Sequence, residues 1–272
     1  MQPLLTAAET RTAEAEAERH GLPASILMEN AGAAVARAAL SLGTSTARFL
    51  VVAGPGNNGG DGYVAARKLH AGGRQVDVWH VGDPARLKGD AARNHAAVEQ
   101  AGVPVHSSAA AIPLRPGDVV IDALFGTGLA RAPDGEAADA VRAMIRWHAE
   151  GVRVLAVDLP SGLASDTGRA FEPRVSADVT VTFGAVKLGL ALEPGATLAG
   201  RVEVADIGLA ALSPASWLLE PADGPRWLPG RRSDTNKGTY GHVLVVAGSR
   251  GKSGAAALAG LSALRSGVGL CT

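Results

Sequence analysis

The sequence predicts an α/β protein: a doubly wound, Rossmann-like, mostly parallel sheet with helices on both faces. Short apolar runs bounded by glycine, typical of strands buried on both faces, alternate with stretches of helical spacing. Such alternation implies right-handed crossovers between parallel strands. Three of the expected strands end in polar, glycine-rich loops, which is where ligands bind in sheets of this kind.

Two helices are predicted first along the chain. Thr6 and Glu9 have the spacing of a capping box, and the helix that follows runs to a glycine cap at Gly21. A second helix begins near Pro23 and continues to Gly43. The alanine-rich faces of these helices suit a dimer contact, and packing against the core explains them equally well.

Strands and helices then alternate. The predicted strands are 49–53, 75–81, 103–106, 118–128 with its glycine-rich end, 152–162 running into a loop, and 177–183. The predicted helices between them are 63–70, 90–100 and 134–150. Residues 54–62 are expected to form a loop.

Composition excludes several classes of protein. Lys and Arg together number 26, as do Asp and Glu, so no overall charge attracts nucleic acid or an anionic membrane. The N-terminus lacks the regions of a signal peptide, and no apolar run is long enough to cross a membrane. The lone Cys271 excludes an internal disulfide and suits a reducing cytoplasm. We therefore expect a cytoplasmic protein that binds neither nucleic acid nor membrane.

The first of the three loops carries a partial dinucleotide fingerprint. Gly54, Gly56 and Gly59 fit the glycine pattern that lets a backbone approach a pyrophosphate, although this pattern alone is weak. The acidic residue that should hold a ribose hydroxyl is poorly placed, because Asp77 lies inside the next strand and Asp83 lies beyond it. An NAD-dependent oxidoreductase is therefore a possible but disfavoured interpretation.

Oxygen-bearing side chains gather in the same loops. The first loop supplies Asn58, and the equivalent strand ends supply Asp122 and Ser161. One carboxylate, one amide oxygen and one hydroxyl carry a low total charge, which suits a monovalent cation better than Mg²⁺. The alternative is that Asp122 and Asp158 only cap turns.

Four stretches resemble the NAD(P)H-hydrate epimerase family. VVAGPGNNGGDGYVAARKL, DALFGTGLARAP, AVDLPSGLASDTG and ADVTVTFGAVKLGL match it in order and spacing, and the resemblance covers residues 4–209. It implies an isomerase that interconverts the R and S forms of hydrated NADH and NADPH, called NADHX and NADPHX, in nicotinamide nucleotide repair. It also implies a homodimer formed through the N-terminal helices, or a larger homo-oligomer for a longer chain.

The resemblance also implies site residues, carried over motif by motif. The implied substrate-binding residues are Asn57, Asn58, Gly59, Gly60, Asp61, Gly126, Thr127, Gly128, Leu129, Ala130, Arg131, Ala132 and Asp158. One K⁺ per subunit is implied, coordinated by Asn58, Asp122 and Ser161. No organic cofactor besides the substrate itself is implied.

Epimerisation inverts the ring carbon that bears the hydroxyl, so water or the ring nitrogen must leave and return. A carboxylate near that carbon could serve as acid and base, and Asp158 is the expected residue. A role in binding ribose or a turn is equally open for Asp158, and Asp61 or Lys187 could serve instead. A non-catalytic binding module is a third interpretation, which the joint presence of Asn58, Asp122, Asp158 and Ser161 disfavours.

Three regions are expected along the chain. Residues 1–212 form the epimerase domain, and the proline-rich stretch 213–230 is a linker. Residues 231–272 resemble the start of the ADP-dependent NAD(P)H-hydrate dehydratase domain, an incomplete ribokinase-like fragment. A P-loop at Gly251 fails because Val246 stands where its first glycine is needed. One strand and helix cannot bury a core, so we expect an exposed or partly ordered tail without dehydratase activity. A longer natural chain would add dehydration of the S form.

Overall fold

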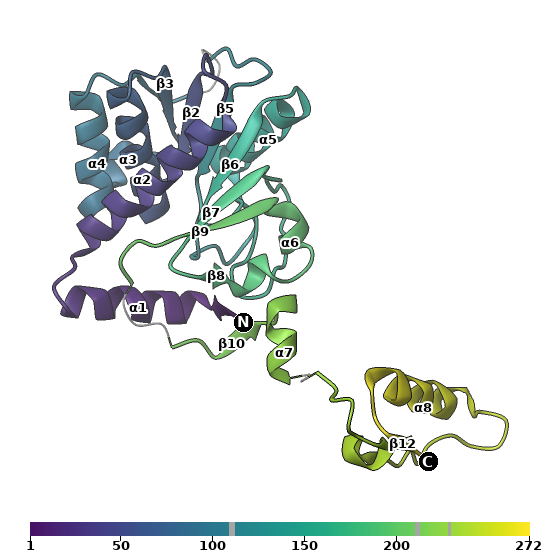
Figure 1. The fold of residues 1–272 in the computed structure, drawn as a ribbon. Coiled ribbons are helices and arrows are strands. Elements are labelled where there is room, and N and C mark those ends of the chain that lie inside the picture. The colour runs from purple at the N-terminus through teal and green to yellow at the C-terminus, as the bar shows by residue number, and fades with distance from the viewer. Residues whose placement is uncertain (109–111, 210–212, 228–229) are drawn as a thin grey trace. The chain divides into compact units, whose positions relative to one another are not determined.

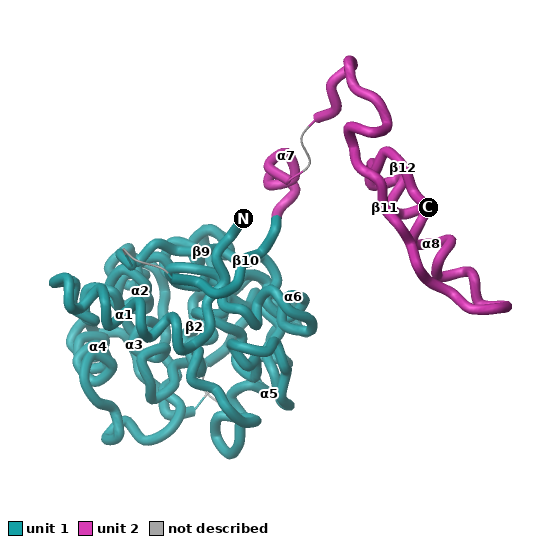
Figure 2. The backbone as a smooth tube through the Cα atoms, turned by 90° about the horizontal axis from the view of Figure 1, so that it is seen from below, with its two compact units in different colours: residues 1–219 teal, residues 220–272 magenta. Residues whose placement is uncertain are grey.

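The computed structural model describes residues 1–108, 112–209, 213–227 and 230–272. Figure 2 colours its two compact units, Met1–Leu219 and Glu220–Thr272. The predicted domain boundary at residue 212 lies outside the described residues. In the part of the chain that is described, no helix combines the length and apolar character that crossing a membrane requires.

A seven-stranded sheet forms the centre of the first unit (Figure 1). Its order is β4-β3-β2-β5-β6-β7-β9, and every pair of neighbours is parallel. The strands are β2 Phe49–Ala53, β3 Val76–His80, β4 Val105–His106, β5 Val119–Ala123, β6 Arg153–Val157, β7 Val179–Phe183 and β9 Arg201–Ala205. The predicted fold class is confirmed. β9 was not predicted, because this edge strand is partly exposed and lacks a continuous apolar run.

Helices cover both faces of the sheet. Phe49, Val51 and Ala53 of β2 pack into one core with the helices α2 (Ala24–Leu42), α3 (Asn57–Ala71) and α4 (Gly89–Gln100). The alternate residues Leu50 and Val52 pack into a second core with α5 (Gly135–Ala149). Successive strand residues point to opposite faces, so the apolar run FLVVA is explained by a strand that is buried on both sides.

The N-terminal helix α1 spans Ala7–Arg19 and has the predicted capping box. Thr6 N donates to Glu9 Oε2 over 2.8 Å, and Glu9 N donates to Thr6 Oγ1 over 3.2 Å. The strand before it, β1 (Gln2–Leu5), pairs with β8 (Val186–Lys187) and with β10 (Ser216–Leu218). β10 lies inside the stretch expected to be a linker, and it belongs to the first unit because its backbone completes the hydrogen bonds of β1.

The glycine-rich stretch corrects one prediction. Residues 57–62 were expected in a loop with a helix from Tyr63, but α3 begins at Asn57 and includes them. A Cβ added at Gly59 would lie 2.0 Å from the Gly54 carbonyl oxygen, and one at Gly62 would lie 2.6 Å from Ala123 Cβ. These glycines therefore let the first turns of a helix press against the ends of β2 and β5.

The second unit is small and largely exposed. Its elements are α7 (Gly224–Trp227), β11 (His242–Val243), α8 (Gly254–Ser266) and β12 (Leu270–Cys271). β11 and β12 pair in parallel, and α8 has no buried residue. The apolar run HVLVVAG, residues 242–248, was expected to be a strand, and β11 covers only its first two residues. The first unit also contains the short helix α6 (Gly195–Leu198), and single 3₁₀ turns occur at 84–86, 188–190, 221–223 and 237–240.

Candidate functional site

Asp122 and Ser161 meet at the carboxyl end of the sheet. Ser161 Oγ donates to Asp122 Oδ1 over 2.6 Å, and Ser161 N donates to Asp122 Oδ2 over 2.7 Å. Both residues are fully buried. Asp122 lies in β5 and Ser161 follows β6, which is the neighbouring strand, so the parallel register brings the two strand ends together. The predicted convergence of these two loops is therefore present.

Asn58 reaches the same place from the first turn of α3. A Cβ added at Gly126 would lie 3.1 Å from Asn58 Oδ1, so the Asn58 side chain sits against that residue. Gly126 directly follows Phe125, whose N–H donates to Ser161 Oγ over 3.1 Å. Asn58 is only 9% exposed, and among the described residues its Nδ2 has no hydrogen-bond partner. A buried amide in this state is costly unless a ligand group satisfies it.

Burial raises the pKa of Asp122 to about 6, against the opposing effect of hydrogen bonds from Ser161 and Leu124. Within the described ranges no lysine or arginine forms an ion pair with Asp122. A buried carboxylate without a cationic partner is stabilised either by a proton or by a bound cation. The local set of a carboxylate, an amide oxygen and a hydroxyl consists of hard donors, which fit K⁺.

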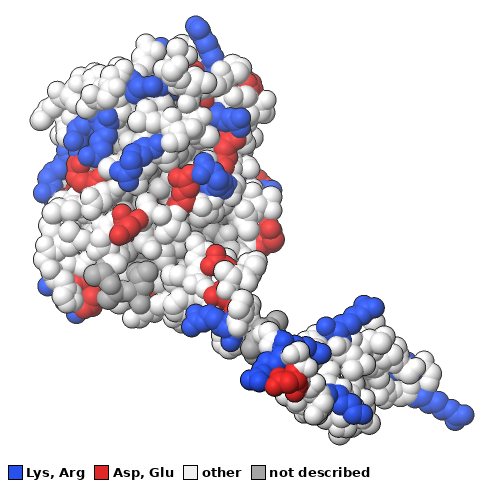
Figure 3. Space-filling view, in the orientation of Figure 1, with Lys and Arg blue, Asp and Glu red and all other residues white. Residues whose placement is uncertain are grey.

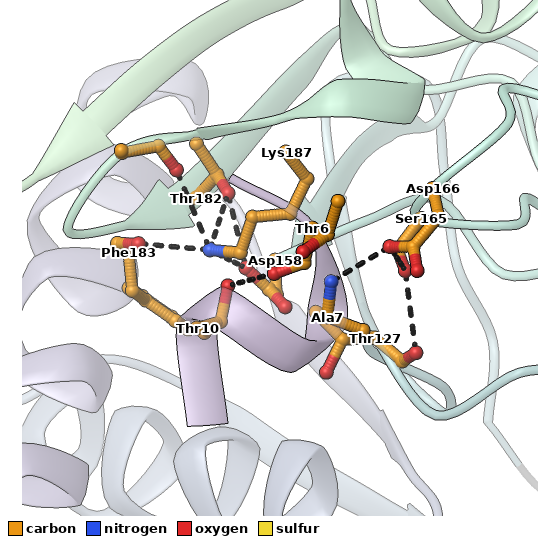
Figure 4. A network of polar contacts seen from close by, with 11 residues as sticks. Thr6, Ala7, Thr10, Thr127, Asp158, Ser165, Asp166, Thr182, Phe183 and Lys187 are labelled. Atoms are coloured by element: carbon orange, nitrogen blue, oxygen red, sulfur yellow. Dashed lines mark hydrogen bonds and ion pairs between the residues drawn. The ribbon is translucent and has the colours of Figure 1, made fainter. Parts of the chain in front are cut away.

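Asp158 is held by a buried lysine (Figure 4). Lys187 Nζ lies 2.8 Å from Asp158 Oδ1, and Thr182 Oγ1 donates to the same oxygen over 3.0 Å. Lys187 Nζ also donates to the Phe183 carbonyl over 2.8 Å. Asp158 adopts a left-handed conformation with φ of 66°, a rare state for a residue with a side chain. Lys187 is therefore fully buried and part of this site.

A cavity of about 270 Å³ opens between α1, α2 and the start of α3. Its wall includes Asp61 and Asn57 from α3, and Arg11 and Glu14 from α1. Burial, followed by the charges of Asp158 and Glu14, raises the pKa of Asp61 well above its usual value. Sequence reasoning missed Arg11 and Glu14. Their spacing of three residues puts them on one face of a helix, but only the tertiary structure shows that this face borders the cavity.

In the loop after β5, residues 126–132 are half-exposed to exposed. Leu129 N donates to the Gly126 carbonyl over 3.4 Å, and the Thr127 carbonyl accepts from Ser165 Oγ over 3.4 Å. Gly128, Ala130 and Ala132 are exposed. Arg131 pairs with Asp134 at 3.5 Å, and its side chain is 83% exposed, so it lies at the surface. Gly59 and Gly60 are buried in α3, where they permit packing. The ligand roles of these residues stay predictions.

The charges on the face drawn in Figure 3 are of both signs. Blue basic and red acidic side chains alternate over the first unit, with no large patch of one sign. This distribution agrees with the equal numbers of basic and acidic residues in the sequence. Recognition of an anionic ligand therefore depends on local groups and not on a general positive surface.

Comparisons with known proteins point to one family. The family described as "YjeF-related protein N-terminus" matches residues 24–189. The bifunctional NAD(P)H-hydrate repair enzyme Nnr of Thermofilum pendens is 45% identical over 260 residues, which cover 93% of this chain and 49% of that protein. The NAD(P)H-hydrate epimerase of Limosilactobacillus fermentum is 40% identical over 186 residues, covering 68% of this chain and 87% of that protein.

The fold also has a solved counterpart. The crystal structure of the yeast protein ynu0, YNL200c, matches with a TM-score of 0.61 and 26% identity, over 69% of this chain and 83% of that one. The chain spans about half the length of the bifunctional enzymes that it matches.

Proposed function

This chain belongs to the family of YjeF-related protein N-termini, and on that premise we propose that it interconverts the R and S hydrates of NADH and NADPH. The observation that carries the proposal is the buried Asp122–Ser161 contact beside Asn58 at the carboxyl end of the sheet. These three residues come from three of the four stretches that resemble the epimerase family. The similarity to an NAD(P)H-hydrate epimerase over 68% of the chain supports the same reaction.

We further propose that Asn58, Asp122 and Ser161 coordinate one K⁺. Two features of the site fit a cation. The buried carboxylate of Asp122 has no positively charged partner among the described residues, and the pKa of Asp122 is raised because its hydrogen bonds do not offset the cost of burying its charge. A bound K⁺ would neutralise this carboxylate and favour negatively charged ligand groups nearby. The first turn of α3 would contribute backbone N–H groups to the pyrophosphate, as helix N-termini do.

Proton transfer is assigned to Asp158. The protonated acid would give its proton to the hydroxyl that leaves the nicotinamide ring as water. The carboxylate would then take a proton from the water that adds to the opposite face of the ring, so no water or proton is consumed overall. Lys187 Nζ, 2.8 Å from Asp158 Oδ1, would hold the Asp158 side chain in position for both transfers. Asp61 is the second candidate, because it lines the cavity and its pKa is raised, which favours the protonated acid.

We also propose a division of the chain into domains. Residues 1–212 would form the epimerase domain and 231–272 the start of a dehydratase domain. The stretch 213–230 would connect them, with β10 pairing to β1 of the first unit. The bifunctional relatives, which are matched over 93% of this chain but 49% of their own length, support this division. We expect residues 1–272 to show no ADP-dependent dehydration of the S hydrate. The homodimer rests on the family resemblance alone, because the alanines of α2 pack in the core of the single chain. The lone cysteine supports a cytoplasmic location.

The direct test starts from one purified hydrate epimer. Its conversion to the other epimer is followed by chromatography, in KCl and in an equal concentration of NaCl. We expect conversion faster than the spontaneous rate, with KCl more effective than NaCl. No acceleration in either salt would remove the proposed activity. Addition of ADP tests dehydration, and incubation with NAD and an alcohol tests the oxidoreductase alternative through the absorbance of reduced nicotinamide.

A further inference from the structure

A second cavity, here called the His80 pocket, lies at the carboxyl end of β3. Its volume is about 240 Å³, and its wall includes His80, His95, Glu99, His106 and Ser107. His80 is the last residue of β3 and pairs in register with Ala53, the last residue of β2. α3, with its glycine-rich first turns, follows β2. The pocket is thus one strand away from the proposed pyrophosphate site, and none of the residues predicted to bind substrate lines it.

His80 carries an unsatisfied polar atom in this wall. The residue is 3% exposed, its Nδ1 lies 2.6 Å from the Tyr63 hydroxyl, and its Nε2 has no hydrogen-bond partner among the described residues. His80 Nδ1 is the hydrogen-bond partner found for the fully buried Tyr63 hydroxyl among the described residues, so the phenol donates to Nδ1 and its own O–H is not left unsatisfied. The hydrogen of the neutral ring is then on Nε2. A buried N–H without an acceptor is costly, and a ligand acceptor would remove that cost.

The ring of His80 is kept neutral by its surroundings. Burial and the neighbouring His95 lower the pKa of His80. These effects exceed the opposite effect of the Asp83 and Glu136 charges and of a contact with the Asp83 backbone, which does not meet hydrogen-bond geometry and so leaves Nε2 unsatisfied. The other two imidazoles face carboxylates. His106 Nε2 lies 2.9 Å from Asp77 Oδ1, and His95 Nδ1 lies 3.5 Å from Glu99 Oε2. No lysine or arginine is among the described residues that line the pocket, so these residues offer none of the cationic donors that favour a phosphate group.

We propose that the His80 pocket binds the adenine ring of the dinucleotide substrate, an inference that rests on the proposed function. In doubly wound sheets a dinucleotide crosses the carboxyl edge at the point where strand order reverses, with one half on each side. Here that point lies between β2 and β5. Asp122 and Asp158 lie at the ends of β5 and β6, which assigns the nicotinamide half to that side. The adenosine half then falls on the β3 side.

The chemistry of the wall fits a neutral aromatic base. Nε2–H of His80 is a donor for a ring nitrogen of adenine, and the Glu99 carboxylate is an acceptor for its exocyclic amine. The His95 ring offers a surface for stacking, as aromatic side chains do for bases in other nucleotide sites. The position where dinucleotide-binding folds usually place a ribose-binding carboxylate is taken by His80. An adenine ring bound in the His80 pocket would explain both why the ribose-binding carboxylate is absent and why the pocket is present.

The test fills the pocket and compares two substrates. Ser107 is exposed at the pocket, so the Ser107→Trp variant brings an indole into it without removing a buried contact. Ser41→Trp, at an exposed position of α2 outside the pocket, is the matched control. We expect Ser107→Trp to raise KM for NADHX about tenfold, while KM for the hydrate of reduced nicotinamide mononucleotide, which has no adenosine, stays within twofold of the wild type. The control should leave both constants unchanged.

Binding of 5′-AMP separates a failure of this inference from a failure of the proposed function. Imidazole ¹H–¹⁵N spectra of the wild type and of Ser41→Trp should show 5′-AMP shifting the His80 and His95 resonances, whether or not the protein epimerises a hydrate. Ser107→Trp should not respond, and His95→Ala, which removes one wall, should respond more weakly. Histidine resonances of the wild type that ignore 5′-AMP, or an equal rise in KM for both hydrates, would overturn the inference.

Discussion

Ser161 donates its hydroxyl proton to Asp122 over 2.6 Å, although 39 positions separate the two residues in the chain. The contact joins the end of β5 to the residues that follow β6, and it forms only when these strands lie side by side. The contact leaves the Asp122 carboxylate fully buried at the carboxyl end of the sheet. The folded protein thereby holds a negative group ready for a proton or a cation, at the place where doubly wound sheets bind nucleotides.

Replacement of Asp122 by Asn should abolish the stimulation of epimerisation by K⁺. The amide keeps the volume of the side chain but removes the charge that attracts the ion. Rates measured over a series of KCl concentrations check this. Asp139→Asn, which alters an exposed ion pair on α5, is the control and should keep the wild-type KCl dependence. An Asp122→Asn enzyme that responds to KCl as the wild type does would show that the ion assignment is wrong.

Gly126→Ala should impair the site through Asn58. The added Cβ would lie 3.1 Å from Asn58 Oδ1, which is closer than most real contacts, so the amide must move. Gly224→Ala is the control, because a Cβ there meets nothing within 4 Å, its backbone is helical and no ligand role is predicted for it. We expect the first variant to need more KCl for half-maximal rate and to lose roughly tenfold in kcat/KM, a change of about 1.4 kcal/mol. Equal kinetics for the two variants would contradict the placement of Asn58.

Lys187→Met should destabilise the protein strongly. The substitution leaves the Asp158 carboxylate buried without its 2.8 Å partner, which costs about 3–5 kcal/mol in comparable buried pairs. The control is Lys68→Met, which breaks a partly exposed pair with Glu29 and should cost about 0–1 kcal/mol. Urea unfolding at pH 7 measures both free energies. A Lys187→Met protein as stable as Lys68→Met would mean that the buried pair contributes no more than a surface one.

Asp61→Asn should raise stability at neutral pH. Because burial and the nearby carboxylates raise the pKa of Asp61 in the folded state, the proton is bound more tightly when folded than when unfolded. The favourable contribution of the protonated acid is complete below the unfolded pKa of 3.8, and it is lost as pH rises through the folded pKa. The neutral amide avoids this loss. Tm should therefore exceed that of the wild type at pH 7, with roughly 2–4 °C for each kcal/mol regained.

The same comparison at lower pH gives the sign of the effect. The difference in Tm between Asp61→Asn and the wild type should shrink as pH falls toward 4, where the wild-type acid is protonated in both states. Asp139→Asn, on the exposed face of α5, should show no such trend. A difference that grows at low pH would mean that Asp61 is stabilised as an anion, and it would remove Asp61 from the candidates for the catalytic acid.

Several elements follow from local sequence alone. The apolar run of β2 and the capping box of α1 specify structure through adjacent residues, and both agree with the structure. β1, β8 and β10 could not be predicted, because each has only two to four residues and β1 pairs with residues about 180 to 210 positions away. The start of α3 was misplaced for a related reason. Its glycines are poor helix formers, and only their close contacts with the Gly54 backbone just after β2 and with the side chains of Val51 and Ala123 explain their presence.

By itself, the amino-acid sequence determined the parallel sheet, the order of its strands along the chain and the three polar motifs, because periodicity and strand-end chemistry are local properties. Tertiary structure alone decided which of these polar groups are buried together. It showed that Asp122 has no cationic partner within the described residues while Asp158 has Lys187, and that Glu14 and Asp61 border one cavity. Burial and long-range charge act through space, so they depend on neighbours that the chain order does not reveal.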